Sequence, residues 1–550
     1  MFAHVGPEAL LVSVALMLAL LCPKLGASWF RRVEHALSAL ARRRFASILF
    51  CGFSALTLRL AMLPWLPVPL PYINDEFSFL LAGDTFAHGR LANSAHPMWR
   101  HFETFHVIFH PTYASMYPPL QGFILAAGQI IARQPFWGVW LSVGIMCSAF
   151  CWMLQAWFSP PWALLGGMLP VMRFGVLSYW DNSYWGGALA ATGGALLLGA
   201  MPRILRHHRV RDAILMALGI AILANTRPYE GLVLTVVVGA GVAFCIFHNK
   251  PAPQPLVLQI ALPMLVVLAM CGFATGYYFW RVAGGPFSIP QKLNRDTYAM
   301  ARYFYWQTAY PEPAYHHKAM RDFYGVELTE FNHAHSLPGV LVQWAKMAGR
   351  SWLFFLSPVL TPPLFMLPRI ICDRRIRFLL IAGAIAMASS ALVVFFNINY
   401  VAPIACIVLA LVVQGMRHLR VWCWEGKPSG QFLVRATLLL CFAMVPIETH
   451  ILAAPPAAGS WGAIGPERMQ IEKKLESLSG QQLVLVRYGP NHNPMYEWVY
   501  NGAEIDQQKV VWARDMNSAQ NDELLKYYST RRVWLLEPDS MPLRLSEYSP

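Results

Sequence analysis

The chain has 550 residues, of which 56% are hydrophobic and 13% are charged, and its mean hydropathy is +0.41. A soluble domain carries roughly a quarter charged residues, so this composition excludes an ordinary soluble protein. The net charge of +14 does not indicate a nucleic-acid partner, because the basic residues gather in short loops between apolar runs. Those runs approach the roughly 20 residues that cross a lipid bilayer, which predicts a multi-pass membrane protein.

Basic residues mark one side of the membrane. They gather in four short loops, at about residues 31–44, 203–211, 374–377 and 417–427. Short basic loops face the cytoplasm under the positive-inside rule. The loop at about 66–117 instead carries four acidic residues against two arginines, and we expect it on the external face.

The apolar segments follow one another along most of the chain. The first, at about 7–22, is either an uncleaved span or a signal-like anchor. A second span at about 45–65 leads to the external loop. Four segments follow between 119 and 201, and one of them is expected to be short or broken, because the charges require an odd number of crossings. Later spans alternate around a second external loop at about 281–350, which gives about twelve or thirteen spans.

The C-terminal part, residues 454–550, differs from the apolar core at 1–453. Short β-rich runs alternate there with polar, helix-compatible stretches, at Gln481–Tyr488, Lys509–Arg514 and Arg531–Glu537. This alternation predicts a small external α/β domain with a parallel sheet. The absence of a glycine-rich phosphate loop gives no reason to expect a bound nucleotide. The predicted fold is therefore mainly α, a polytopic transmembrane helical core with a small C-terminal α/β domain.

Two adjacent carboxylates, Asp75 and Glu76, stand where the chain leaves the second span for the external face. A carboxylate at the membrane surface can accept a proton from a hydroxyl and make its oxygen a better nucleophile. The alternative is structural, with Asn74 or Asp75 capping a helix at Glu76–His88 and the acids favoured by the dipole of its first turn. Position alone leaves both interpretations open.

Ordered motifs after this pair resemble the first external loop of GT-C superfamily membrane glycosyltransferases. These include protein O-mannosyltransferases, lipid A aminoarabinose transferases and lipopolysaccharide-core sugar transferases. The resemblance rests on "DEFSFLLAGDTFAHGRL" and then "TYASMYPPLQGFILAAGQ": an Asp-Glu pair, a surface helix ending in Gly-x-Leu, and Tyr-Pro-Pro-Leu opening the next span. In this sequence those positions are Asp75–Glu76, Gly89–Leu91 and Tyr117–Leu120.

The resemblance implies an activity and its partners. The donor would be a sugar on polyprenyl phosphate, and the acceptor a hydroxyl of a glycolipid, glycan or protein. Asp75 would be the catalytic general base of an inverting transfer, with Glu76 supporting it or positioning the acceptor. Asp181 in "SYWDNSYWGG" resembles the family's acidic residue at the outer start of a later span. As an acid flanked by aromatic residues at an interface, it is either a substrate-binding residue or a solvated acid in an aromatic belt. The expected location is a bacterial inner membrane, with the long loops and the C-terminal domain in the periplasm.

A leaving phosphate requires cationic side chains on the external face. Arg227 in "NTRPYE" is a candidate, and its partner is either Glu230 or the donor phosphate. Lys292 and Arg295 lie among aromatic residues in the second external loop, in a pattern that equally fits an amphipathic surface helix. Tyr117 is a further substrate-binding candidate.

Histidines crowd the external loops, but their spacing matches no metal-ligand template. The resemblance leaves a divalent ion open, and we assign no metal ligands. Two other functions compete with sugar transfer: a transporter or lipid flippase, and a non-catalytic protein that binds polyprenyl lipid in the cell envelope. Against the transporter stand the long external loops, the α/β tail and the lack of an inverted repeat.

Overall fold

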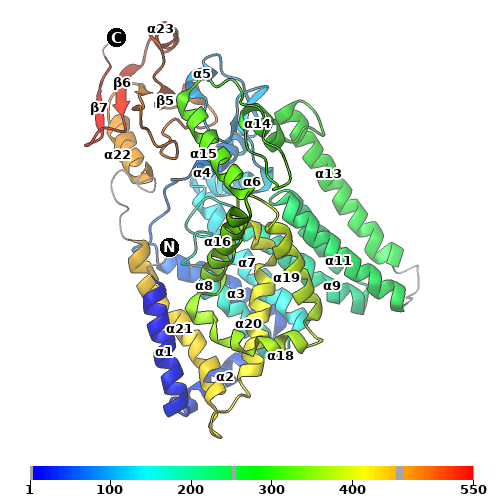
Figure 1. The fold of residues 1–550 in the computed structure, drawn as a ribbon. Coiled ribbons are helices and arrows are strands. Elements are labelled where there is room, and N and C mark those ends of the chain that lie inside the picture. The colour runs from blue at the N-terminus through cyan, green and yellow to red at the C-terminus, as the bar shows by residue number, and fades with distance from the viewer. Residues whose placement is uncertain (1–3, 250–255, 454–463, 549–550) are drawn as a thin grey trace.

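The computed structural model describes residues 4–249, 256–453 and 464–548, and it divides into a helical body and a small mixed α/β domain (Figure 1). The predicted boundary between the two, at 453/454, borders residues 454–463, which lie outside the described part. The helices before the second external loop are α1 (Val5–Leu21), α2 (Ala27–Arg42), α3 (Arg44–Ala61), α4 (Asn74–Ala87), α5 (Trp99–Phe102), α6 (Pro119–Ala132), α7 (Phe136–Trp157), α8 (Pro160–Arg173), α9 (Gly187–His207), α10 (Val210–Ala224), α11 (Pro228–Asn249), η1 (Leu256–Ala261) and α13 (Leu262–Ala283).

The remaining helices belong to the second external loop, the last spans and the C-terminal domain. They are α14 (Pro290–Tyr298), α15 (Lys318–Ala334), α16 (Leu337–Phe355), α17 (Ser357–Leu360), η2 (Pro362–Met366), α18 (Leu367–Cys372), α19 (Arg377–Ser390), η3 (Ile398–Tyr400), η4 (Ala402–Ile404), α20 (Ala405–Leu419), α21 (Ser429–Leu452), α22 (Ile464–Glu476), η6 (Ile505–Gln507) and α23 (Ser518–Tyr527).

Within the described residues, seven helices are long and apolar enough to cross a membrane, or eight if the segments 337–355 and 357–372 count as one span bent by 80°. Three shorter apolar helices, α1, α6 and α19, add to these. This confirms the helical membrane core, although the sequence-based count of twelve or thirteen spans is higher. The counts differ mainly because five of the expected spans, α1, α6, α8, α10 and α19, are helices of only 14 to 17 residues, and after α8 the chain is irregular from Phe174 to Gly186.

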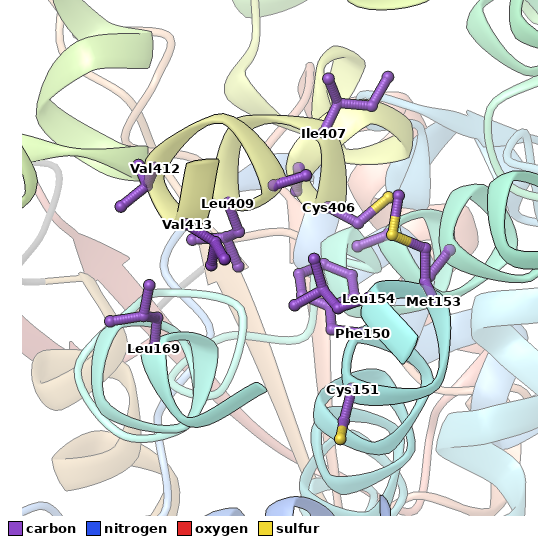
Figure 2. Packing of buried hydrophobic residues seen from close by; sticks show 14 of the residues in the cluster. Phe150, Cys151, Met153, Leu154, Leu169, Cys406, Ile407, Leu409, Val412 and Val413 are labelled. Atoms are coloured by element: carbon purple, nitrogen blue, oxygen red, sulfur yellow. The ribbon is translucent and has the colours of Figure 1, made fainter. Parts of the chain in front are cut away.

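The core of the helical body lies where α7, α8, α9 and α20 meet. Phe150 and Leu154 of α7 and Val413 of α20 have essentially no exposed surface, and Figure 2 shows them within one apolar cluster. Close approach depends on small residues. A Cβ at Gly194 of α9 would lie 1.8 Å from the carbonyl oxygen of Pro403, so a side chain there would push the chain just before α20 away.

The two long loops that the sequence predicts on the external face form a layer on one end of this body. Strands β1 (Asn93–Ser94), β3 (Thr112–Ser115) and β2 (Val107–Ile108) make a small antiparallel sheet in that order, beside the surface helix α4. The second external loop binds to the first: the Asn294 side chain donates a hydrogen bond to the carbonyl of Val107 over 2.9 Å. Two loops about 200 residues apart in sequence therefore build one surface.

The C-terminal domain has a four-stranded sheet in the order β5-β4-β6-β7, from β4 (Gln482–Val486), β5 (Val510–Arg514), β6 (Arg532–Glu537) and β7 (Arg544–Glu547). Strands β5, β4 and β6 are parallel, as predicted, and β7 adds an antiparallel edge. The domain docks on α4. Tyr500 stacks on Phe77 with ring centroids 4.3 Å apart, and the Ala503 amide donates to Asp84 over 2.7 Å.

Candidate active site

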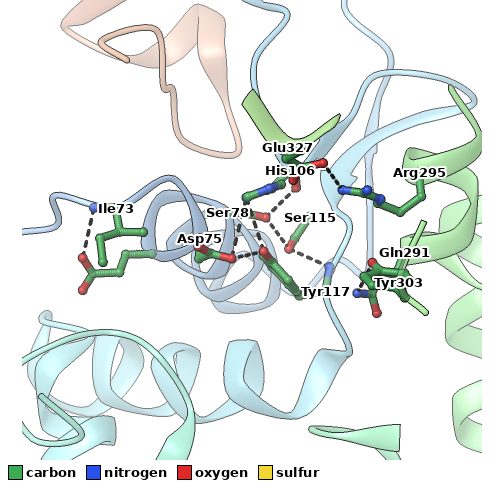
Figure 3. Close-up of polar contacts among 11 residues, drawn as sticks. Ile73, Asp75, Ser78, His106, Ser115, Tyr117, Gln291, Arg295, Tyr303 and Glu327 are labelled. Atoms are coloured by element: carbon green, nitrogen blue, oxygen red, sulfur yellow. Dashed lines mark hydrogen bonds and ion pairs between the residues drawn. The ribbon is translucent and has the colours of Figure 1, made fainter. Parts of the chain in front are cut away.

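Asp75 lies in the first turn of α4, and its side chain keeps 19% of its surface exposed. Its Oδ1 accepts a hydrogen bond from the hydroxyl of Tyr117, and Nδ1 of His106 lies 3.7 Å from the same oxygen (Figure 3). The hydroxyl oxygen of Tyr117 and Nδ1 of His106 are themselves 3.3 Å apart. In the part of the chain that the structure describes, Oδ2 has no hydrogen-bond partner, so one oxygen of this half-buried carboxylate remains available to a ligand.

Tyr117 is held as a hydrogen-bond donor to Asp75. Burial, followed by the negative charge of Asp75, raises the pKa of its phenol well above the ordinary value, so Tyr117 keeps its proton at neutral pH. Its ring stacks on Phe79 of α4 at 4.4 Å. The hydroxyl of Tyr117 is directed to the carboxylate of Asp75, and its predicted contact with substrate stays a prediction.

His106 occupies a constrained backbone position. Its φ of 59° lies in the left-handed region, which non-glycine residues seldom adopt. Its carbonyl accepts hydrogen bonds from the Ser78 hydroxyl over 2.7 Å and from the Met116 amide over 3.2 Å. Ser78 also bonds to Ser115 over 2.7 Å. The loop is thus tied to α4, which places the imidazole next to Asp75.

Glu76 has a different environment from its neighbour. It is fully buried, and its carboxylate accepts backbone N–H groups from Tyr72 at 3.0 Å, Ile73 at 3.3 Å and Tyr184 at 2.9 Å. The predicted helix exists, but Asn74 and Asp75 do not cap it, because both lie inside α4 and its N-cap residue is Ile73, whose amide donates to Glu76. The carboxylate joins the start of α4 to the segment before α9 and so positions Asp75.

Burial raises the pKa of Glu76 to about 7, although three backbone hydrogen bonds act in the opposite direction. Because the folded-state pKa lies above the ordinary 4.5, its stabilising effect is complete below about pH 4.5 and is lost as the pH rises through 7. The stabilisation that is lost over this pH range amounts to about 3 kcal/mol at most. The Glu76→Gln variant cannot titrate at this position. We therefore expect the difference between the Tm of the wild type and the Tm of this variant to decrease as the pH is raised from 5 to 8. Thermal unfolding in detergent measures this, and a constant difference would contradict it.

Arg227 and Tyr400 form a second part of the site. The guanidinium of Arg227 lies 5.3 Å from the centroid of the Tyr400 ring, and no ion pair joins it to Glu230 among the described residues. The charges of Arg227, Glu230 and Asp75 all act on the buried phenol of Tyr400. Arg227 is thus a half-buried cation beside Tyr400, and its guanidinium has no hydrogen bond or ion pair with the residues that the structure describes.

Arg295 and Lys292 in α14 do not offer free cations. Arg295 is buried, and it donates hydrogen bonds to Glu327 and to the carbonyl of Ala301, both over 2.7 Å. Lys292 is exposed and pairs with Asp296 one turn away. Within this loop the structure brings a different residue toward the site: Tyr303, whose hydroxyl accepts a hydrogen bond from Gln291 over 2.8 Å (Figure 3).

Asp181 is buried in the helical body, with 0% of its surface exposed. Its Oδ2 lies 3.5 Å from Nε of Arg59, whose other nitrogens donate to the carbonyls of Leu66 and Pro67. This position does not fit a solvated acid in an aromatic belt. The burial corrects the solvated-acid alternative, because a buried arginine partner from α3 could not be seen in the sequence around Asp181, while the substrate contact stays a prediction.

No group of three or more histidine, cysteine or acidic side chains that could hold a metal ion is present among the described residues. His316 and His317 lie 3.0 Å and 3.5 Å from the buried Glu103, which Tyr298 also contacts. This cluster joins the two external loops. We assign it a structural role, and the site residues above are proposed without a metal.

Comparison with known proteins gives structural neighbours only. No protein-family model matches the chain, and no curated protein sequence matches it significantly. The structure of ArnT from Cupriavidus metallidurans bound to undecaprenyl phosphate is 12% identical, with 90% of this chain and 92% of that chain covered and a TM-score of 0.48. The apo form of ArnT gives 11% identity, coverages of 88% and 93%, and a TM-score of 0.47.

A more distant neighbour is archaeal oligosaccharyltransferase AglB from Archaeoglobus fulgidus, in complex with an inhibitory peptide and a dolichol-phosphate. It is 12% identical, covers 90% of this chain and 69% of its own, and has a TM-score of 0.38. Both ArnT and AglB are GT-C superfamily members, the superfamily whose loop motifs this sequence resembles. Identities of this size transfer no residue roles, so the roles below rest on the geometry of this chain.

Proposed function

We propose that the chain is a membrane glycosyltransferase that moves a sugar from a polyprenyl-phosphate donor to an acceptor hydroxyl on the external face. The observation that supports this most is the half-buried Asp75 carboxylate, with one oxygen bound by Tyr117 and the other unpartnered among the described residues. The surface helix α4 holds it beside the helical body, where a lipid-linked donor and a second substrate would meet.

In the proposed reaction, Oδ2 of Asp75 accepts the proton of the acceptor hydroxyl as that oxygen attacks C1 of the sugar. The bond between C1 and the phosphate oxygen breaks, and the electron pair leaves with the phosphate. Attack opposite the leaving group inverts the anomeric centre. The products are the glycosylated acceptor, polyprenyl phosphate and a proton on Asp75, which passes to solvent.

Arg227 is suited to the departing phosphate, because a guanidinium forms strong, charge-assisted hydrogen bonds with phosphate oxygens. Tyr400 lies under the guanidinium and keeps it oriented. Tyr117 and His106 position Asp75 through its other oxygen, and Glu76 does so through the backbone at the start of α4. Holding both substrates at one interface supplies part of the rate enhancement.

We propose a bacterial inner membrane location, with the C-terminal domain in the periplasm, on the basis of the basic loops at the opposite end. The proposed activity is tested with membranes that contain the full-length chain and a panel of polyprenyl-phosphate sugars. Mass spectrometry of cell-envelope glycans from a deletion strain identifies the acceptor, which should lose one sugar. If the wild type consumes no polyprenyl-phosphate sugar and the deletion changes no glycan, the proposal fails.

A further inference from the structure

A cavity of about 260 Å³ opens between α2, α8 and α21. These helices lie in the helical body, away from the C-terminal domain (Figure 1). Its interior is apolar. The side chains that line it include Leu37 of α2, Leu165 and Met168 of α8, and Val434 and Leu438 of α21. A hollow of this composition, open at the side of a membrane protein, favours a hydrocarbon chain as its occupant.

Charged residues lie at the same cavity. Arg435 donates two hydrogen bonds to Glu34, at 2.8 Å and 3.0 Å, and these lower the pKa of the Glu34 carboxyl. Arg420 is exposed, and its guanidinium lies 5.9 Å from the ring of Trp162 with no ion pair among the described residues. One acid against two arginines leaves the polar rim with one unneutralised positive charge.

Helix α2 has the character of an interfacial helix. Arg31, Arg32 and His35 line one exposed face, and Trp29, which also borders the cavity, is 52% exposed. Basic residues beside an exposed tryptophan are typical of helices that lie at the boundary between headgroups and acyl chains. The proposed topology places this boundary on the cytoplasmic side.

We propose that this cavity binds one anionic glycerophospholipid of the cytoplasmic leaflet. One acyl chain occupies the space between Leu37, Leu165 and Leu438, and the phosphate and anionic headgroup pair with Arg420. The apolar interior selects a lipid, and the single unpaired cation at the rim selects negative charge. The site would fix α2 against α8 and α21, and it is separate from the donor site proposed on the opposite side of the membrane.

The test uses the full-length protein purified in detergent and titrated with dioleoyl phosphatidylglycerol or dioleoyl phosphatidylcholine, with bound lipid counted by native mass spectrometry. We expect one phosphatidylglycerol site that Arg420→Ala weakens roughly tenfold, the effect of losing one charge-assisted hydrogen bond. Arg374→Ala is the matched control, because it removes an exposed arginine from another basic loop. It should leave this site unchanged.

A second variant tests the cavity itself. Leu165→Trp fills the space for the acyl chain and should remove the bound phosphatidylglycerol, while an unchanged elution profile and sugar-transfer rate show that the fold is intact. Equal affinities for the two phospholipids, or equal losses in Arg420→Ala and Arg374→Ala, would overturn the proposal. So would binding of undecaprenyl phosphate at this site in preference to phosphatidylglycerol, since the occupant would then be a second donor-type lipid.

Discussion

Replacing Asp75 with Asn should lower the rate of sugar transfer by roughly 10²- to 10⁴-fold, the usual contribution of a general base. Asparagine keeps the shape of the side chain and an oxygen that can accept from Tyr117, so α4 and its contacts should persist. What is lost is the ability of Oδ2 to take a proton. The measurement is product formation from a polyprenyl-phosphate sugar in membranes that contain equal amounts of each protein.

Asp322→Asn is the matched control for this prediction. Asp322 lies in α15, in the second loop expected on the external face, and its carboxylate pairs with Lys318. Its loss should leave the rate within about twofold, as expected for one exposed ion pair. Sugar transfer by Asp75→Asn at the wild-type rate, with the protein present in the membrane, would remove Asp75 from the role of base.

The fold was predictable where one local pattern decides it. The surface helix expected at Glu76–His88 is observed at Asn74–Ala87, and each predicted β-rich run of the tail contains a strand. The number of spans was not predictable to the same degree. An apolar run reports that a segment is buried or in lipid, and it does not fix the length of the helix, as the 14-residue helix α8 within the expected span at 161–178 shows.

The place of Asp75 at the start of a helix was predictable, and the residues that surround it were less so. His106 is one of five histidines in its loop, and nothing local distinguishes it; its place follows from Ser78 and Ser115, which hold the loop against α4. The sequence around Arg295 predicts a phosphate ligand, but Glu327, 32 residues later, neutralises the charge of its guanidinium. In each case the deciding partner is distant in sequence, and only the folded chain brings it near.

The alanine variant of Arg227 should reduce kcat/KM for the donor by roughly 10²-fold, because one cation that stabilises the departing phosphate is removed. Lysine at the same position should restore part of the activity, since it supplies the charge without the two-pronged geometry of a guanidinium. If Arg227 has only a structural role, the two variants should instead lose activity in proportion to their loss of stability. Loss of the stacking on Tyr400 would then lower the Tm in both variants, and activity would follow stability.

Lys292→Ala is the matched control for Arg227→Ala, because Lys292 is an external cation already paired with Asp296. We expect it to retain the wild-type kcat/KM. Initial rates at varied donor concentration separate the two variants, and Tm values in detergent show whether the fold is maintained. If Arg227→Ala and Lys292→Ala lose activity equally, the phosphate is held by general positive charge on this face, and the specific assignment to Arg227 fails.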